Sequence, residues 1–501
     1  MKSYDLVIIG SGVGGGSVAL QLAGSNAKVL IIERGPRLPR EAQNWDPEAV
    51  FCENRYRTNE TWWADERPFH PGMFYYVGGN TKFFGTAMFR FREKDFDALS
   101  HTEGISPAWP IKYDDLESWY GQAEALFGVH GQAGIDPTEP PRSSGYSLGP
   151  IPHEPVIDRI AKRLSARGLT PFPMPSAVDF GLQGRCVRCG TCDAFPCKID
   201  AKGDAETRLI QPACRSSNIE LMTDALVERL ETDDTGRTIS AAIVNINGNR
   251  ERIVANTFVL SAGAINSAAL LLRSANSHNP SGLANSSDVV GRNYMTHNTS
   301  ALMAIHPFKI NNTQFPKTLA IHDYYFGETE GDFPLGSLQL LGKIKEPMLR
   351  GALGGIPKFL RSALASHSVD WYAQSEDLPH PDSRVTIRPD GAINLHWHHT
   401  NMKTHQRWVS KCKSILRETG YPIVLSKPFG TDVVSHQCGT IRFGNDPTTS
   451  ALDTYCKAWD HENLFVMDSS FFPSSAAVNP ALTIAAQGLR VGKYIREGIL
   501  K

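Results

Sequence analysis

The chain lacks any long apolar run, and this absence excludes a membrane-spanning helix. No uninterrupted apolar stretch approaches the roughly 18 residues that such a helix needs. The hydrophobic core of a signal peptide is also missing, because Met1-Lys2-Ser3 leads directly into a core strand. We therefore expect a cytoplasmic protein without membrane insertion.

A surplus of charge and a high cysteine density are missing as well. Lys and Arg number 51 and Asp and Glu 52, giving a net charge of -1, so nothing favours nucleic acid as a partner. Nine cysteines in 501 residues are too few for a disulfide scaffold, and free thiols are the default expectation. With 41% hydrophobic residues the chain is ordinary globular material, and we expect a small-molecule ligand in a pocket.

The first forty residues carry a pattern typical of dinucleotide binding. A Val/Ile-rich strand ending at Gly10 leads into GSGVGG, an apolar helix and a second strand that ends at Glu33. Gly10 permits the tight turn, Gly12 lets the backbone approach a pyrophosphate and Gly15 lets helix and strand pack closely. Glu33 is placed to accept hydrogen bonds from ribose hydroxyls. The alternative is a glycine-rich turn without a ligand, and the motif does not separate FAD from NAD.

The last forty residues repeat the same kind of arrangement. A strand from Leu464 to Met467 ends at Asp468, and a long amphipathic helix begins near Pro480. A carboxylate and a helix N-terminus thus reach the edge where open α/β sheets bind ligands. We expect the two ends of the chain to meet there.

Six motifs occur together in this chain, and they cover nearly its whole length: Gly10 to Gly35, Tyr75 to Phe96, Ser261 to Ser274, Val289 to His297, Ser435 to Gly444 and Val466 to Gly492. With them the chain resembles the glucose-methanol-choline (GMC) family of FAD-dependent oxidoreductases. The resemblance implies an α/β fold: a Rossmann-like FAD-binding domain, of the type shared with p-hydroxybenzoate hydroxylase, and a substrate domain built on an antiparallel β-sheet.

The resemblance also implies the domain limits. The FAD-binding domain is expected to be discontinuous, over residues 1–297 and 430–501, with a lid or insert near 41–75 and a Cys-rich segment at 184–200. The substrate-binding domain is expected over 298–429.

The cofactor contacts follow from the same resemblance. Gly10, Gly12 and Gly15 would hold the pyrophosphate and Glu33 the ribose. The remaining matches to the family's FAD site are Gly79 and Asn80 beside the flavin, Val227 near the adenine, Ala262 against the cofactor, Asp468 near the ribityl chain and Pro480 at the helix start. Classical pyranose oxidases tether FAD through a histidine in a Thr-His-Trp context. This chain has Thr81-Lys82-Phe83 there, so we expect non-covalent FAD.

The resemblance places the catalytic pair at His436 and Asn479. Histidine suits the removal of a hydroxyl proton near neutral pH, because its unperturbed pKa is about 6.5. The amide of Asn479 is suited to holding the substrate oxygen. A metal role for His436 is disfavoured, since no second ligand stands at a suitable spacing. The HWHH run at 396–399 reads as a polar strand, with a metal tract as the alternative.

Several stretches resemble the sugar-oxidising branch of the family: pyranose oxidases, glycoside 3-oxidases and amino-sugar oxidases. A sugar site needs aromatic platforms and hydrogen-bonding groups, and WYAQSED at 371–377 offers both. Gln374 and Trp371 are the candidate substrate contacts, with a core position as the alternative for Trp371.

Four cysteines, Cys186, Cys189, Cys192 and Cys197, lie within twelve residues. Their spacing departs from a ferredoxin run by one residue before the last cysteine. An iron-sulfur cluster, structural zinc, disulfides and free thiols all stay open, with no metal as the main expectation.

The leading hypothesis is FAD-dependent oxidation of a secondary hydroxyl, at C3 or C2, of a sugar or glycoside. Dioxygen or another electron acceptor would reoxidise the flavin. The alternatives are an amino-sugar alcohol oxidase, a dehydrogenase with a non-oxygen acceptor, a redox-silent FAD lyase and a non-catalytic flavoprotein subunit.

Overall fold

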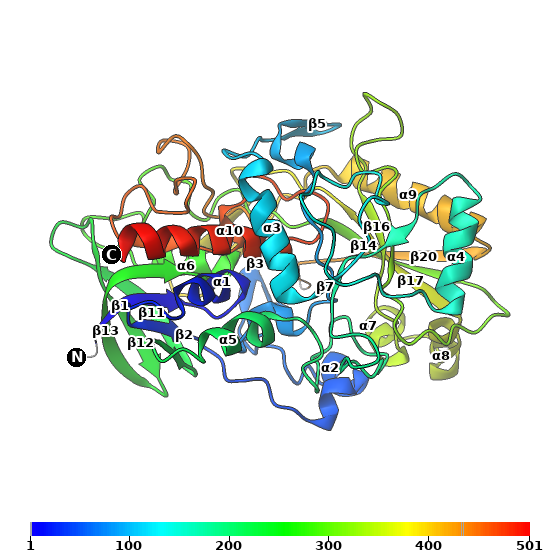
Figure 1. The fold of residues 1–501 in the computed structure, drawn as a ribbon, viewed down its shortest axis with the longest axis horizontal. Coiled ribbons are helices and arrows are strands. Elements are labelled where there is room, and N and C mark those ends of the chain that lie inside the picture. The colour runs from blue at the N-terminus through cyan, green and yellow to red at the C-terminus, as the bar shows by residue number, and fades with distance from the viewer. Residues whose placement is uncertain (1–2, 432, 434, 501) are drawn as a thin grey trace.

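Two β-sheets dominate the computed structural model, which describes residues 3–431, 433 and 435–500 (Figure 1). The strands are β1 Ser3–Ile9, β2 Val29–Ile32, β3 Trp62–Ala64, β4 Arg67–Phe69, β5 Leu99–His101, β6 Gly104–Ser106, β7 Val129–His130, β8 Phe172–Pro173, β9 Ser176–Ala177, β10 Ile219–Met222, β11 Ala225–Thr232, β12 Ile239–Ile246, β13 Asn249–Leu260, β14 Asn298–Ile305, β15 Leu319–Ile321, β16 Ser337–Leu340, β17 Ser368–Ser375, β18 Arg384–Ile387, β19 Ile393–His396, β20 Ile423–Pro428 and β21 Leu464–Val466.

The α-helices are α1 Val13–Leu22, α2 Pro47–Phe51, α3 Asp114–Phe127, α4 Pro155–Ser165, α5 Gln211–Ala213, α6 Ala264–Arg273, α7 Arg350–Leu353, α8 Lys358–His367, α9 Met402–Glu418 and α10 Ala481–Tyr494. Short 3-10 turns cover Ala42–Trp45, Gly79–Lys82, Glu93–Phe96, Glu346–Leu349 and Ser469–Phe471, and π-turns cover Glu206–Ile210 and Ile495–Ile499. Among the described residues, none of these helices is long and apolar enough to cross a bilayer.

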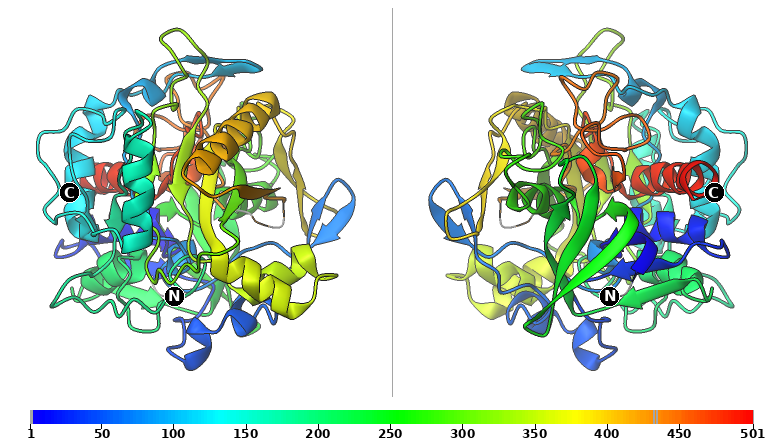
Figure 2. Two further views of the ribbon diagram at one scale, coloured as in Figure 1. Left: turned by 90° about the vertical axis from the view of Figure 1, so that its right-hand side faces the viewer. Right: turned by 90° about the vertical axis from the view of Figure 1, so that its left-hand side faces the viewer.

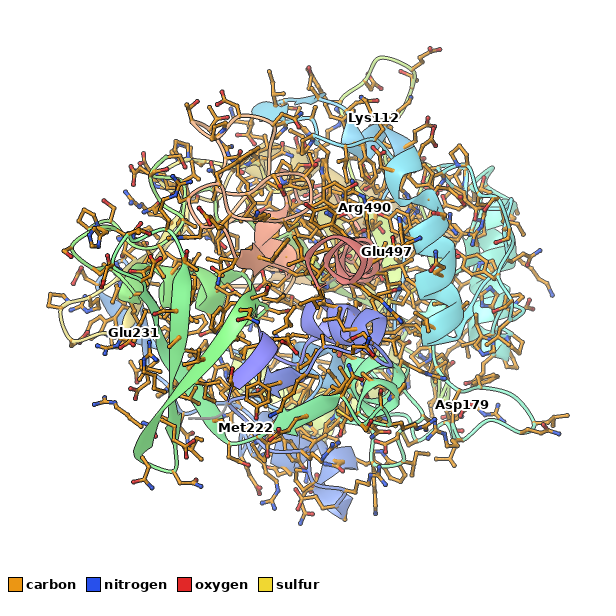
Figure 3. The ribbon with its side chains drawn as sticks, turned by 60° about the vertical axis from the view of Figure 1, so that its left-hand side comes forward. Lys112, Asp179, Met222, Glu231, Arg490 and Glu497 are labelled. Carbon is orange, nitrogen blue, oxygen red and sulfur yellow. The ribbon has the colours of Figure 1, made fainter. Side chains whose placement is uncertain are left out.

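The first sheet is mainly parallel. β10, β2, β1, β13 and β21 run side by side in one direction, so strands from both ends of the chain share it. Residues Leu6 to Ile9 of β1 are all buried, as expected for a parallel strand that is covered on both faces. The first half of β13 extends beyond the parallel strands and forms an antiparallel meander with β12 and β11. Met222 marks β10 and Glu231 marks β11 in Figure 3, at the two ends of the strand order.

Helix α10 lies between α1 and α3 on one face of this sheet (Figure 1). The approach of α1 to the chain's C-terminal segment depends on glycine. A Cβ atom on Gly14 would stand 1.8 Å from the carbonyl oxygen of Met467. Because that contact is backbone, no side chain fits there, and this close approach joins the N-terminal βαβ unit to β21.

The second sheet is antiparallel, in the order β20-β14-β17-β16-β15-β8. Five of its strands lie within 298–429, and β8 comes from outside that range. One face carries a buried apolar cluster that α4 and α9 cover, on the side opposite the parallel sheet (Figure 2).

The segment near 41–75 is attached to the 384–396 region by a third sheet. β3 pairs with β19 and β4 pairs with β3, giving the order β18-β19-β3-β4. Trp62 on β3 is buried in this arrangement. Of the polar strand expected at 396–399, only His396 lies in a strand. β19 ends at that residue, and the rest of HWHH lies in irregular chain.

Candidate functional site

The turn between β1 and α1 has the geometry that a pyrophosphate needs. Gly10 adopts φ +105°, a left-handed region that favours glycine, and a Cβ on Gly15 would lie 2.2 Å from the Gly10 oxygen. Gly12 differs from both, because a Cβ there would meet nothing within 4 Å. Gly12 also caps the N-terminus of α1. The two packed glycines therefore shape the turn, and the open one leaves room beside the helix start for a ligand.

Glu33 stands directly after β2 and is buried. Its carboxylate accepts hydrogen bonds from the Ser11 amide (3.1 Å), the Ser11 hydroxyl (2.6 Å) and the Gly35 amide (3.0 Å). Burial raises the pKa of Glu33, and these hydrogen bonds oppose that shift. Glu33 thus holds the glycine turn in place through these hydrogen bonds. A contact between Glu33 and the ribose remains a prediction.

The loop at Gly78 and Gly79 lies against the same turn. Both glycines have positive φ, +94° and +59°, and the Gly78 amide donates to Ser11 Oγ at 3.1 Å. A Cβ on Gly79 would lie 3.3 Å from the Gly12 Cα, so the two loops face one another. Asn80, next in sequence, is exposed.

Asp468 joins the end of β13 to the C-terminal segment. Its Oδ2 accepts hydrogen bonds from the Gly263 amide at 2.9 Å and from Ser267 Oγ at 2.5 Å. Gly263 directly follows Ala262 in the sequence. Burial raises the pKa of Asp468. A Cβ on Gly263 would meet nothing within 4 Å, so this edge is open in the same way as at Gly12. Val227 is buried in β11, and Pro480 precedes α10 directly.

These residues suit the pyrophosphate of an extended dinucleotide. The N-terminus of α1, the open glycines Gly12 and Gly263 and the buried carboxylates that follow β2 and β21 are the groups suited to it. The individual contacts of Gly10, Gly12, Gly15 and Asp468 with FAD remain proposals. Together they define an edge of the parallel sheet suited to the cofactor.

His436 and Asn479 meet, as predicted from the motifs in which they occur. Asn479 Nδ2 lies 3.3 Å from His436 Nε2, although 43 residues separate them in sequence. Asn479 directly precedes Pro480 and α10, whereas His436 stands in a loop with φ +58°. Burial lowers the pKa of His436 well below its ordinary value, and the nearby imidazole of His297 lowers it further. The imidazole is therefore uncharged near neutral pH and available as a base.

Two further side chains, not expected from the sequence, lie at this pair. His297 Nδ1 is 2.9 Å from His436 Nδ1, and Gln339 Nε2 donates to Asn479 Oδ1 at 3.0 Å. His297 closes the VVGRNYMTH motif, so its place in a family motif was an available signal. Gln339 had none, because only the pairing of β16 with β17 brings it here.

The two candidate substrate contacts are corrected by the alternation of β17. Trp371 is fully buried in the apolar cluster beneath α9, on the face opposite Gln374. Its indole is a core side chain. Gln374 does lie at the site, with Nε2 2.7 Å from His297 Nδ1 and Oε1 accepting from Gln339 at 2.6 Å. Since it is fully buried and both ends of its amide are engaged, we assign it to holding the imidazoles and not to substrate contact.

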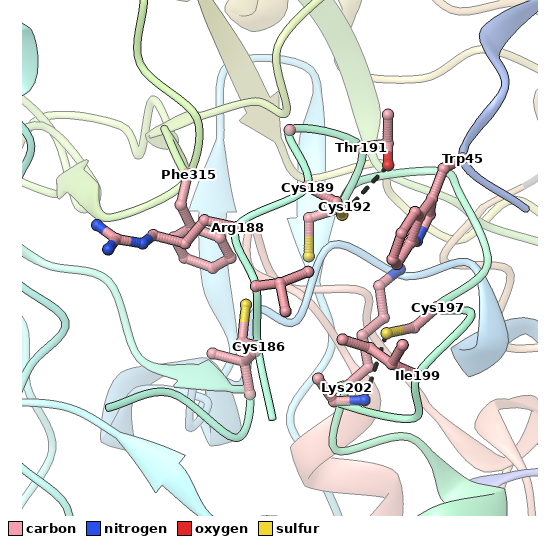
Figure 4. Close-up of a pocket in the computed structure, with 14 residues that line it drawn as sticks. Trp45, Cys186, Arg188, Cys189, Thr191, Cys192, Cys197, Ile199, Lys202 and Phe315 are labelled. Atoms are coloured by element: carbon pink, nitrogen blue, oxygen red, sulfur yellow. Dashed lines mark hydrogen bonds between the residues drawn. The ribbon is translucent and has the colours of Figure 1, made fainter. Parts of the chain in front are cut away.

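The four clustered cysteines line a cavity of about 20 Å³, room for about one water molecule (Figure 4). Burial raises the pKa of Cys192 to about 12 and raises that of Cys186, so both thiols are protonated. Within the described part of the chain all nine cysteines are free, and no three His, Cys, Asp or Glu side chains are grouped to hold a metal. We assign no step of the chemistry to this segment.

Comparison with known proteins gives the family. Two models described as GMC oxidoreductase match residues 72–299 and 379–488. A 6'''-hydroxyparomomycin C oxidase of Streptomyces lividus is 30% identical over 99% of this chain and 91% of its own length. The fructose dehydrogenase large subunit of Gluconobacter japonicus is 27% identical over 98% of both chains.

The fold agrees with this result. The solved structure of pyridoxine 4-oxidase from Mesorbium loti superposes with a TM-score of 0.67 over 98% of this chain and 99% of its own, at 17% identity. The likeness confirms the predicted fold class. The chain belongs to the GMC oxidoreductase family of FAD-binding enzymes that act on CH–OH groups.

Proposed function

We propose that this protein oxidises a secondary hydroxyl, at C3 or C2, of a sugar or glycoside to the ketone. The observation that carries the proposal is the contact between His436 Nε2 and Asn479 Nδ2. It places a neutral base beside an amide at the start of α10.

The two side chains divide the work on the substrate hydroxyl. The amide of Asn479 donates a hydrogen bond to the substrate oxygen and holds it near His436. His436 then accepts the hydroxyl proton at Nε2 as the O–H bond breaks, while the adjacent C–H bond supplies the hydride. When bound, FAD supplies the hydride-accepting chemistry. General-base assistance of this kind is typically worth about 10² to 10⁴ in rate.

The relatives support a carbohydrate substrate. The names of the two relatives described above place a hydroxyparomomycin and fructose among their substrates, and a third, from Streptomyces fradiae, is a paromamine 6'-oxidase with 28% identity over 99% of this chain. Two of the three names are aminoglycoside oxidases. This favours one second candidate, an alcohol oxidase acting on an amino sugar.

We further propose that FAD is held without a covalent bond. Lys82, at the position of the tethering histidine of classical pyranose oxidases, is 2% exposed and donates to Glu206 at 2.9 Å and Asp204 at 3.1 Å. Burial alone would lower the pKa of Lys82, but these two carboxylates raise it above its ordinary value. A charged ammonium is not a nucleophile. Acid precipitation should therefore release all flavin into the supernatant, and flavin retained in the pellet would refute this point.

The test of the function is an anaerobic screen for flavin reduction. Free sugars, O-glycosides, C-glycosides and amino sugars are each mixed with the holoenzyme, and bleaching of the flavin absorbance is followed before air is readmitted. We expect a neutral sugar or glycoside to reduce the flavin, and mass and NMR analysis to give a keto product at C3 or C2. Reduction by amino sugars alone, with an aldehyde product, would favour the second candidate. Absence of reduction by every alcohol would overturn both.

His436→Ala tests the base. The variant should bind FAD as the wild type does, yet reduce it about 10² to 10⁴ times more slowly with the substrate found in the screen. His278→Ala is the matched control, since His278 is an exposed histidine outside the site. Unchanged reduction kinetics in His436→Ala would refute the assignment of the base.

A further inference from the structure

We propose that His297 is the positioning residue that fixes the tautomer of His436, with a lone pair at Nε2. The inference rests on the proposed function, because it concerns how His436 is prepared to accept a proton. His297 itself is buried and 3% exposed, beneath His436.

A carbonyl group fixes the orientation of His297. His297 Nε2 lies 3.0 Å from the Ser475 carbonyl oxygen. A carbonyl only accepts, so Nε2 carries the proton of this bond. Burial lowers the pKa of His297 to about 4, and the ring is therefore neutral with a lone pair at Nδ1.

The contact at that lone pair determines which nitrogen of His436 carries the proton. His436 Nδ1 lies 2.9 Å from His297 Nδ1, a distance at which two lone pairs would repel. With both rings neutral, His436 Nδ1 must donate, which leaves Nε2 of His436 unprotonated. The Asn479 amide then donates to that nitrogen at 3.3 Å until a substrate hydroxyl replaces it.

Two buried amides, those of Gln374 and Gln339, contact these groups. Gln374 Nε2 donates to His297 Nδ1 at 2.7 Å, and Gln339 Nε2 donates to Gln374 Oε1 at 2.6 Å. Gln339 also donates to Asn479 Oδ1, so the same pair orients the second catalytic side chain. Gln374 Nε2 also lies 3.2 Å from His436 Nδ1, so this amide contacts the Nδ1 atoms of both imidazoles.

A different charged group acts on each of the two imidazoles. Glu376 faces His297 and favours its protonation, but it is occupied by His101 and Ser106. Lys317 disfavours protonation of His436 and is paired with Asp193. When His436 takes the hydroxyl proton, its Nδ1–H still faces His297 Nδ1, and this hydrogen bond becomes charge-assisted.

The decisive measurement is made on the unmodified holoenzyme. In ¹⁵N-histidine NMR, with His436 identified by the signal that His436→Ala removes, His436 should show a protonated Nδ1 and an unprotonated Nε2 at pH 7. The opposite tautomer would overturn the inference.

Variants test the consequence for rate. His297→Leu cannot accept from His436, and flavin reduction should fall about 10²-fold or more, within the range of general-base effects. His297→Gln carries an amide oxygen that can accept, and it should recover part of the loss. Gln374→Glu should move the pH profile of reduction to higher pH, because a carboxylate beside the pair favours the imidazolium. His405→Asn, which removes a buried imidazole elsewhere, should leave the profile unchanged.

The two proposals fail separately. If His436→Ala still reduces FAD at the wild-type rate, the base assignment fails. If His436→Ala is slow but folded His297→Leu and Gln374→Glu both keep the wild-type rate and pH profile, only the role of His297 fails.

Discussion

The parallel and antiparallel sheets present different chemistry to the site between them. The parallel strands β1 and β2 are buried on both faces, and the groups proposed to hold the cofactor are backbone atoms and carboxylates at the strand ends. The antiparallel sheet carries its larger apolar cluster on one face, and β17 projects Gln374 from the other. One sheet thus offers its edge to the proposed cofactor site, and the other offers a face to the proposed catalytic residues. The first role depends on the absence of side chains, and the second depends on which side chains are present.

Substitutions of Gly14 and Gly12 test the edge of the parallel sheet, and Gly14→Ala has the largest expected effect on stability. Gly14→Ala would place a Cβ 1.8 Å from the Met467 oxygen, so α1 and the C-terminal segment must separate. We expect the free energy of unfolding to fall beyond the ~3 kcal/mol at the upper end of ordinary overpacking. Denaturant unfolding without added FAD measures this.

Gly12→Ala is its matched control. Gly12 has φ -69°, which alanine adopts freely, and no neighbour within 4 Å. Stability without FAD should stay within ~0.5 kcal/mol of wild type, while FAD affinity falls. Equal stability losses in the two variants would contradict the division between packed and open glycines.

Trp371 tests the apolar face of the antiparallel sheet. Trp371→Ala removes a fully buried indole from the cluster under α9 and should cost about 3–5 kcal/mol of stability. The affinity for substrate in the folded fraction should change little, because the indole lies on the face away from His436. A large change in KM with little loss of stability would restore Trp371 to the substrate site.

A substitution of His405 has the smallest expected effect on stability. It tests the polar side chains that are packed against the antiparallel sheet. Its ring lies between the hydroxyls of Ser300 and Ser375, each at 2.9 Å, and burial lowers its pKa to about 4. The unfolded state, with a pKa of about 6.5, binds the proton first as pH falls. Stability is therefore lost between about pH 6.5 and 4, at about 1.4 kcal/mol per pH unit for this one group.

His405→Asn should remove that contribution. Denaturant unfolding at pH 7, 6 and 5 should show the variant losing less stability per pH unit than the wild type. Parallel pH dependence in the two proteins would show that His405 titrates alike in the folded and unfolded states.

The sequence predicted the parts of the site that are local in the chain or tied to a motif. The glycine turn, Glu33 and the approach of Asn479 to His436 belong to this group. It did not predict Gln339, because contact between that residue and Asn479 depends on the pairing of β16 with β17. It misplaced Trp371, although the apolar Val369, Trp371 and Ala373 alternate with polar residues along β17 and so mark its core face. The pairing of β3 with β19 also joins segments more than 300 residues apart, beyond any local signal.

The pairing of β21 with β13, and the packing of α10 on α1, have a consequence for how the protein is made. A ribosome adds about 5–20 residues per second, so β1 leaves it roughly 20 to 90 s before β21 is complete. During that interval the Gly14 surface of α1 has no partner, and the cofactor edge is unfinished. The edge proposed to hold FAD is therefore complete only once β21 and α10 have been synthesised.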